Sequence, residues 1–95
     1  MLNARFTVTN DLGLHARAAA NLVKCVSHFQ SSIVLKREDV SRAADAKSIL
    51  NVLTLAATKG TVLEIVIEGP DENDALAALQ DCFGSSFGEN SIQLQ

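Results

Sequence analysis

Gly13-Leu14-His15-Ala16-Arg17 is the most informative stretch of this chain, because a turn here leads directly into an apolar helix. Residues 16–26 are mostly Ala, Leu and Val and contain no helix breaker, while Asp11 and Gly13 before them are typical turn residues. His15 is therefore predicted to lie where the helix begins. Unpaired backbone N–H groups and the positive end of the helix dipole attract anions at such a position.

His15 and Arg17 together indicate chemistry on a phosphoryl group. Histidine is an unusual helix cap, since Ser, Thr, Asp and Asn cap better. A neutral imidazole nitrogen in an anion site can attack phosphorus, while the helix end and a guanidinium hold the phosphate oxygens. The positive surroundings also disfavour the imidazolium form. Against this interpretation stands the commoner role of a lone histidine near a helix start, which is that of a surface or packing residue.

Composition excludes several classes of protein. Ninety-five residues make one domain, and 47% hydrophobic residues with four Phe and no Trp or Tyr indicate an aliphatic core. A net charge of -3 without a basic stripe argues against nucleic-acid binding. No run approaches the ~20 apolar residues of a membrane span, and the N-terminus does not read as a signal peptide. We therefore expect a cytoplasmic protein that does not insert into a membrane.

Cys25 and Cys82 are the only cysteines, far apart in the sequence and each within a predicted helix. Without further cysteines or paired histidines there is no metal-ligand spacing, so we expect neither a metal nor a cofactor. We interpret both thiols as reduced, partly buried packing groups and not as a disulfide. His28, near the end of the first helix, is interpreted as a capping or surface residue.

Hydrophobic periodicity predicts four strands and three helices. The expected strands are residues 6–9, 33–36, a weak one at 40–44, and 62–67, with a charged turn at 36–39. The expected helices are residues 16–29, residues 49–53, and one that starts at Gly69-Pro70-Asp71-Glu72, with Pro at an early position and carboxylates in the first turn. The last helix is expected to turn a set of residues inward: Ala75, Leu76, Leu79, Cys82 and Phe83.

The resulting order βαββαβα predicts an α+β open sandwich, because four amphipathic strands need a cover of helices on one face. Periodicity alone does not distinguish this arrangement from a ferredoxin-like plait. Residues 84–95 are rich in Gly, Ser and Gln and are expected to form a mobile tail of this single domain. Alternatively, Ile92 and Leu94 pair as an extra edge strand.

Separate motifs resemble the HPr family, the histidine-containing phosphocarriers of the bacterial phosphoenolpyruvate-dependent sugar phosphotransferase system. Residues 13–20 resemble the family's active-site signature, and Lys47-Ser48-Ile49 its regulatory serine segment. Residues 58–61 followed by 68–72 resemble its last strand and the entry to its last helix. The resemblance runs from about residue 6 to residue 83. It implies an HPr-like open-faced β-sandwich, a four-stranded antiparallel sheet covered on one face by three helices.

The function implied by this resemblance is that of a phosphocarrier. His15 would accept a phosphoryl group from phosphorylated enzyme I and pass it to sugar-specific enzyme IIA domains. The backbone N–H groups of Ala16 and Arg17 and the Arg17 side chain would stabilise the phosphate. Such a carrier is a substrate of enzyme I and not itself an enzyme, and we expect it to be a monomer.

Ser48 is predicted to cap the helix at residues 49–53. The resemblance adds a second role, phosphorylation by an HPr kinase/phosphorylase, which is compatible with capping because a helix start tolerates a phosphate. Other residues are candidates for binding protein partners, through an apolar patch and two positive charges: Ile49, Leu50, Leu53, Lys24 and Lys47.

The chain departs from the family pattern at three places. Ala18 stands where the family usually has Pro, Ala56 and Ala57 where relatives often carry Gly, and Glu38-Asp39 lengthens the hairpin. None of these removes His15. An alternative function is therefore an HPr-like regulatory protein, of a nitrogen-related branch or an incomplete phosphotransferase system, that acts through protein contacts and not sugar uptake. A small-molecule sensor domain fits this sequence less well, because it needs a Gly-rich ligand loop and none is evident. An acyl carrier also fits less well, because this sequence predicts strands, especially at residues 62–67.

Overall fold

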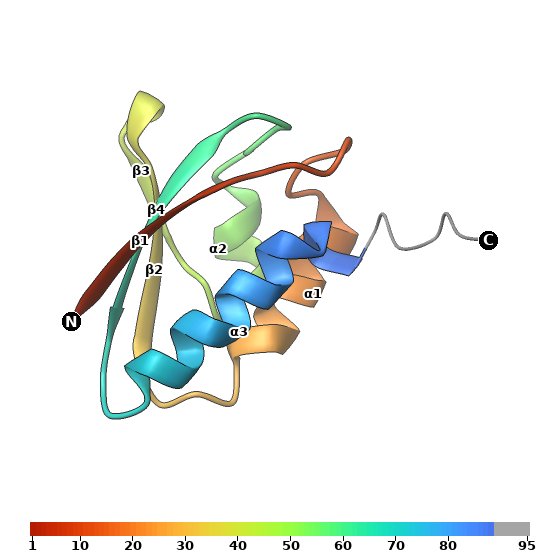
Figure 1. The fold of residues 1–95 in the computed structure, drawn as a ribbon. Coiled ribbons are helices and arrows are strands. Elements are labelled where there is room, and N and C mark those ends of the chain that lie inside the picture. Colours follow the sequence, from red (N-terminus) through yellow and green to blue (C-terminus); the bar gives the residue numbers. More distant parts are fainter. Residues whose placement is uncertain (89–95) are drawn as a thin grey trace.

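One antiparallel sheet carries the fold, with its strands in the order β1-β4-β2-β3. The computed structural model describes residues 1–88, so the predicted pairing of Ile92 and Leu94 lies outside the described residues. The strands are β1 (Leu2–Thr7), β2 (Ser32–Arg37), β3 (Arg42–Asp45) and β4 (Val62–Glu68). The helices α1 (Ala16–Val26), α2 (Ile49–Leu53) and α3 (Glu72–Gly84) all cover the same face of the sheet (Figure 1). The predicted α+β open sandwich is confirmed.

The central strand β4 shows why only one face of the sheet is covered. Leu63, Ile65 and Ile67 are fully buried, whereas the residues between them face the other way. This alternation of period two places one apolar row under the helices. The neighbouring strands add to the same row through their register, with Phe6 opposite Leu63 and Leu35 opposite Ile65.

Helix α1 begins at Ala16, as predicted, but it ends at Val26 and not at residue 29. Ser27 closes the helix through its backbone N–H, which donates to the carbonyl of Val23. His28 lies beyond the helix as an exposed residue whose ring packs against Phe29 with centroids 4.2 Å apart. The residues after Val26 include Ser and His, which have only modest helix propensity, and this explains the earlier end.

The two edge strands also differ from the prediction, because pairing overrides local propensity. Strand β1 begins at Leu2, since its whole length pairs with β4 from Leu2 opposite Ile67 to Thr7 opposite Val62. Strand β3 begins at Arg42, because a 3-10 helix η1 (Glu38–Val40) occupies the expected turn. Ser41 then reverses the chain in a left-handed conformation with φ 54°.

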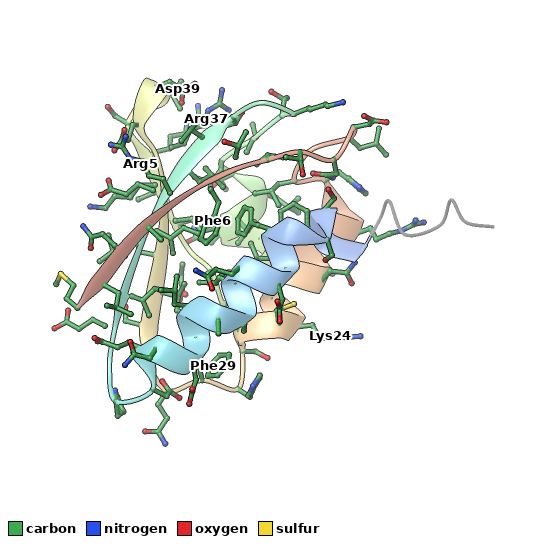
Figure 2. The ribbon with its side chains drawn as sticks, in the orientation of Figure 1. Arg5, Phe6, Lys24, Phe29, Arg37 and Asp39 are labelled. Atoms are coloured by element: carbon green, nitrogen blue, oxygen red, sulfur yellow. The ribbon has the colours of Figure 1, made fainter. Side chains whose placement is uncertain are left out.

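The end of the described chain is packed and does not follow the predicted boundary of a tail at residue 84. Gly84 belongs to α3, and residues 86–88 form the short helix η2 (Ser86–Gly88). Phe87 is 2% exposed and meets Phe83 edge to face, while Phe83 stacks on Phe6. Figure 2 shows Phe6 reaching from the sheet toward α3. The start of α3 differs too, because Pro70 precedes the N-cap Asp71 and lies outside the first turn.

Within residues 1–88, no helix is long and apolar enough to cross a membrane.

Candidate functional site

A tight loop before α1 sets the position of the candidate site. Asn10 is 4% exposed, and its side-chain amide donates to the carbonyl of Gly13 at 2.7 Å. Gly13 has φ +68°, and a Cβ at this position would lie 2.4 Å from the carbonyl oxygen of Ala57. The loop therefore requires glycine here, because a side chain would meet both an unfavourable backbone conformation and a clash.

Leu14 fixes the loop to the segment that follows α2. Its backbone N–H donates to the carbonyl oxygen of Ala57 at 2.8 Å, and its side chain is 3% exposed. The backbone before His15 is therefore held at Gly13 by Asn10 and at Leu14 by Ala57, and this fixes the position of His15 at the helix start.

His15 is the N-cap of α1, in an extended conformation with φ -79° and ψ -176°. Its carbonyl accepts the first helical hydrogen bond, from Ala19 N–H at 2.8 Å. Its ring nitrogen Nδ1 accepts from the backbone N–H of Arg17 at 3.3 Å. A nitrogen that accepts a hydrogen bond carries no proton, so in this arrangement the lone pair of the neutral ring is on Nδ1. The nucleophilic atom thus already points at the helix N-terminus.

The electrostatics of this helix start favour an anion. The first turn of α1 contains no acidic residue, so no carboxylate on it opposes the helix dipole. Arg17 and Ala16 are exposed on that turn. Ala18, which stands in place of the usual Pro, is fully buried inside an intact helix. The predicted site residues His15, Ala16 and Arg17 are therefore brought together at one exposed helix end.

Arg37 supports this site without belonging to it, and it was predicted only as part of a charged turn. Its Nη1 donates to the carbonyl oxygens of Leu55 at 2.9 Å and Ala56 at 2.8 Å. Asp39 holds the guanidinium with two hydrogen bonds, of 2.8 and 3.1 Å. The hydrogen bond from Arg37 lowers the pKa of Asp39. Arg37 thereby anchors the segment after α2 on which Leu14 rests, and Figure 2 shows it beside Asp39 at the end of the sheet.

Leu12, in the loop before α1, and Lys59, in the connection between α2 and β4, were not singled out as site residues from the sequence. Lys59 donates to Asp11 at 2.8 Å and lowers the pKa of that carboxyl, although the 88% exposure of the Asp11 side chain leaves the pair screened by water. Leu12 is 72% exposed, an apolar side chain in solvent close to His15 in sequence. The signal for Leu12 was its apolar type inside a turn, where polar residues are the rule.

Ser48 caps α2 as predicted, with its hydroxyl accepting from the N–H of Asn51 at 3.3 Å. The predicted apolar patch divides into two parts. Ile49 and Leu50 are 40% and 78% exposed, whereas Leu53 is half-buried and packs against the core.

The two lysines predicted to contact partners differ in their surroundings. Lys24 is exposed in the last turn of α1, and Figure 2 shows its side chain directed away from the molecule. Lys47 is half-buried, and its Nζ donates to the carbonyl of Phe29. Lys47 therefore also has a structural role, joining the entry of α2 to the exit of α1.

The structure does not bring Ser48 and His15 together. His15 precedes α1, while Lys47, next to Ser48, bonds to Phe29 beyond the other end of that helix. The 11 residues of α1 span roughly 16 Å at 1.5 Å per residue. Ser48 therefore lies toward the end of α1 that is away from His15.

Comparison with known proteins identifies this arrangement. The family profile described as "PTS HPr component phosphorylation site" matches residues 2–85. The phosphocarrier protein HPr of Xylella fastidiosa (strain Temecula1) is 47% identical over 91 residues, covering 96% of this chain and all of the relative. The phosphocarrier protein NPr of Escherichia coli K12 is 39% identical over 83 residues, covering 87% of this chain and 91% of the relative.

A solved structure agrees with the sequence comparisons. The crystal structure of an HPr from Thermoanaerobacter tengcongensis superposes with a TM-score of 0.87 at 37% identity, covering 95% of this chain and 99% of that one. This match decides in favour of the HPr arrangement over a ferredoxin-like plait. Fold and site together define a small phosphoryl-carrier protein with an open-faced sheet. The chain belongs to the HPr family of phosphocarriers of the phosphotransferase system.

Proposed function

We propose that this protein accepts a phosphoryl group on His15 from phosphorylated enzyme I and passes it to enzyme IIA domains in the cytoplasm. The observation that carries the proposal is the hydrogen bond from Arg17 N–H to Nδ1, because it aims the ring's lone pair into the helix N-terminus. Membership of the phosphocarrier family supports the same role.

The transfer step follows from this geometry. The lone pair on Nδ1 attacks phosphorus, a nitrogen–phosphorus bond forms, and the donor leaves with the electron pair of the bond that breaks. No proton moves, because Nδ1 carries none and the ring proton stays on Nε2. The phosphoryl oxygens then replace the lone pair as acceptors for the Arg17 N–H, and the guanidinium of Arg17 adds charge-assisted hydrogen bonds. Delivery to an acceptor is the reverse of this step.

The test is intact-mass spectrometry after incubation with phosphoenolpyruvate and an enzyme I from the same organism. We expect one phosphoryl group that acid removes, present on the wild type and absent from His15→Ala. His28→Ala is the matched control, because it removes the other histidine, which lies beyond the far end of α1. Phosphorylation of His15→Ala, or none of the wild type, would exclude the assignment.

Arg17 is expected to act on the rate of transfer and not on the fold. Arg17→Ala keeps the capping N–H but loses the guanidinium, so it should accept the phosphoryl group more slowly than the wild type. Arg17→Lys should recover part of the rate, because a point charge replaces a bidentate fork. The same mass measurement at short times gives both rates.

We include Ser48 in the proposal as a regulatory phosphorylation site for an HPr kinase/phosphorylase. A phosphate there would lie next to the exposed side chains of Ile49 and Leu50, and its charge would disturb an apolar contact made through them. Incubation with such a kinase and ATP should add a phosphoryl group that survives acid and is absent from Ser48→Ala.

The curated NPr relative supports a second candidate, a carrier of the nitrogen-related branch that serves regulation and not sugar uptake. Both candidates use His15. Competition between the enzyme I proteins of the two branches distinguishes them, since the cognate enzyme should load this protein faster at equal concentrations.

A further inference from the structure

The two cysteines, far apart in the sequence, face a common hollow at the surface. Cys25 lies in the last turn of α1 and Cys82 in the C-terminal part of α3, and these two helices pack on each other. Both thiols line a hollow of about 280 Å³, together with Ala78, Asp81 and Ser85. Neither is in a disulfide. Both cysteines of the chain therefore lie at the same surface hollow.

The two thiols also differ in accessibility. Cys25 is half-buried, while Cys82 is 4% exposed and belongs to the hydrophobic core. Burial, and next a hydrogen bond with Cys25, raise the pKa of the Cys82 thiol. Because both cysteines line one hollow and α1 packs on α3, the two side chains lie on the same side of the contact between these helices. A small reagent from solvent therefore reacts with Cys25 first, and Cys82 is the buried thiol that can react in a second step.

We propose that Cys25 and Cys82 are a redox-active dithiol that closes to an intramolecular disulfide when the protein meets an oxidised small thiol. In the first step, the Cys25 thiolate attacks one sulfur of oxidised glutathione, forming a mixed disulfide and releasing one glutathione thiolate. In the second, the Cys82 thiol loses its proton to that thiolate and attacks Cys25 Sγ, releasing the second glutathione. Two protein thiols are oxidised, one glutathione disulfide is reduced, and the protons of the two cysteines are carried away by the two glutathiones.

The position of the pair defines what the disulfide would do. It would join α1 to α3 near the C-terminal end of each helix, at the end of α1 that lies away from His15. The loop it closes contains β2, β3, α2 and β4, so the cross-link would restrict much of the unfolded chain. We therefore assign to it protection of the folded protein under oxidation. The redox proposal does not depend on the proposed function.

The first experiment titrates the full-length protein with oxidised glutathione, quenches with an alkylating agent and measures intact mass without reductant. The expected product has lost two hydrogens, carries no glutathione, does not react with the alkylating agent and returns to the dithiol with reductant. Proteolysis should recover the peptides of Cys25 and Cys82 linked to each other. A wild type that accumulates a glutathione adduct, forms disulfide-linked dimers or stays reduced would overturn the proposal.

Two serine variants assign the order of attack. Cys82→Ser should stop at a single glutathione adduct on Cys25, while Cys25→Ser should remain unmodified because Cys82 is buried. An adduct on Cys25→Ser at the same rate as on Cys82→Ser would refute the assigned order. Since Cys82 is a core residue, the melting temperature of each variant is measured first, and peptide mapping of the wild type decides the question if Cys82→Ser does not fold. Oxidation should also raise the wild-type melting temperature reversibly, and an unchanged value would contradict the protective role.

Discussion

Arg37 shows how a single side chain can hold a functional loop that it does not belong to. It donates to two carbonyls in the segment that follows α2, and Asp39 fixes its guanidinium. Its side chain is only 18% exposed, so these hydrogen bonds are partly shielded from water. The segment it holds includes Ala56, which has a left-handed φ of 50°. This conformation is the reason why glycine is suited to the position, and Arg37 is one of the contacts that keep alanine in it.

We predict that Arg37→Ala lowers the free energy of unfolding by about 2 kcal/mol, because two carbonyls lose a charged donor. Urea unfolding measures the change. Arg5→Ala is the matched control, since its guanidinium is 67% exposed and meets Glu38 at 3.4 Å, and it should change stability by less than about 0.5 kcal/mol. Equal effects of the two variants would show that Arg37 does not anchor the loop.

Local sequence pattern was sufficient for some residues of the site and not for others. The position of His15 at the start of α1 was predicted correctly, because a glycine turn, a capping residue and an apolar helix follow one another within a few positions. Arg37 was missed because its acceptors Leu55 and Ala56 are 18 and 19 residues away, across a strand and a helix. Hydrogen bonds between residues so far apart in the sequence produce no pattern that a local analysis of the sequence can detect.

Helices and strands were predicted correctly where the local sequence specifies them. The bounds of α2 follow from the Ser48 cap, and β4 follows from strict alternation of apolar residues. Strand β1 extends further because it pairs with β4, a partner about 60 residues away that the local pattern of β1 does not reveal. Residues 84–88 have the composition of a tail, and tertiary contacts order them, among them the packing of Phe87 on Phe83 and the hydrogen bond between Ser86 and Thr9.

Phe87 is expected to contribute to stability like a core residue. We predict that Phe87→Ala lowers the free energy of unfolding by about 3–5 kcal/mol, because it opens a cavity beside Phe83. Thermal and urea unfolding would both detect this change. Val40→Ala, at a side chain that is 46% exposed, is the control and should have a small effect. If Phe87→Ala were as stable as Val40→Ala, η2 would not be part of the core.

Asp71 joins two connecting segments that are far apart in the sequence. Its carboxylate accepts from the backbone N–H groups of Gln30 at 2.8 Å and Ser31 at 2.9 Å, and from the hydroxyl of Ser31. The hydrogen bond from Ser31 is the main reason why the pKa of Asp71 lies below its usual 3.8. This one carboxylate therefore fastens the α1–β2 connection to the start of α3.

The lowered pKa makes the contribution of Asp71 depend on pH. A carboxyl with a lower pKa in the folded state stabilises the fold above its unfolded value near 3.8, and this stability is lost as the pH falls through the folded value. We predict that Asp71→Asn is less stable than the wild type at pH 7 and that the difference shrinks as the pH falls below about 4. Urea unfolding across this pH range is the measurement, with the exposed Asp74→Asn as control. A difference that stays constant down to pH 2 would contradict the assignment.

The cap at the start of α1 has a consequence for how a carrier can work. His15 Nδ1 caps the helix in the unphosphorylated protein by accepting the hydrogen bond from Arg17 N–H. In the phosphorylated protein the same atom would bear the phosphoryl group, and a phosphoryl oxygen would accept from Arg17 N–H in its place. The helix would then be capped in both states, and neither loading nor unloading would require the backbone to rearrange. The donor and the acceptor of the phosphoryl group would bind the same backbone conformation, so the structure of this protein would not favour transfer in either direction. The direction of phosphoryl transfer would then be set by mass action, that is, by the relative concentrations of the phosphorylated and unphosphorylated proteins in the cell.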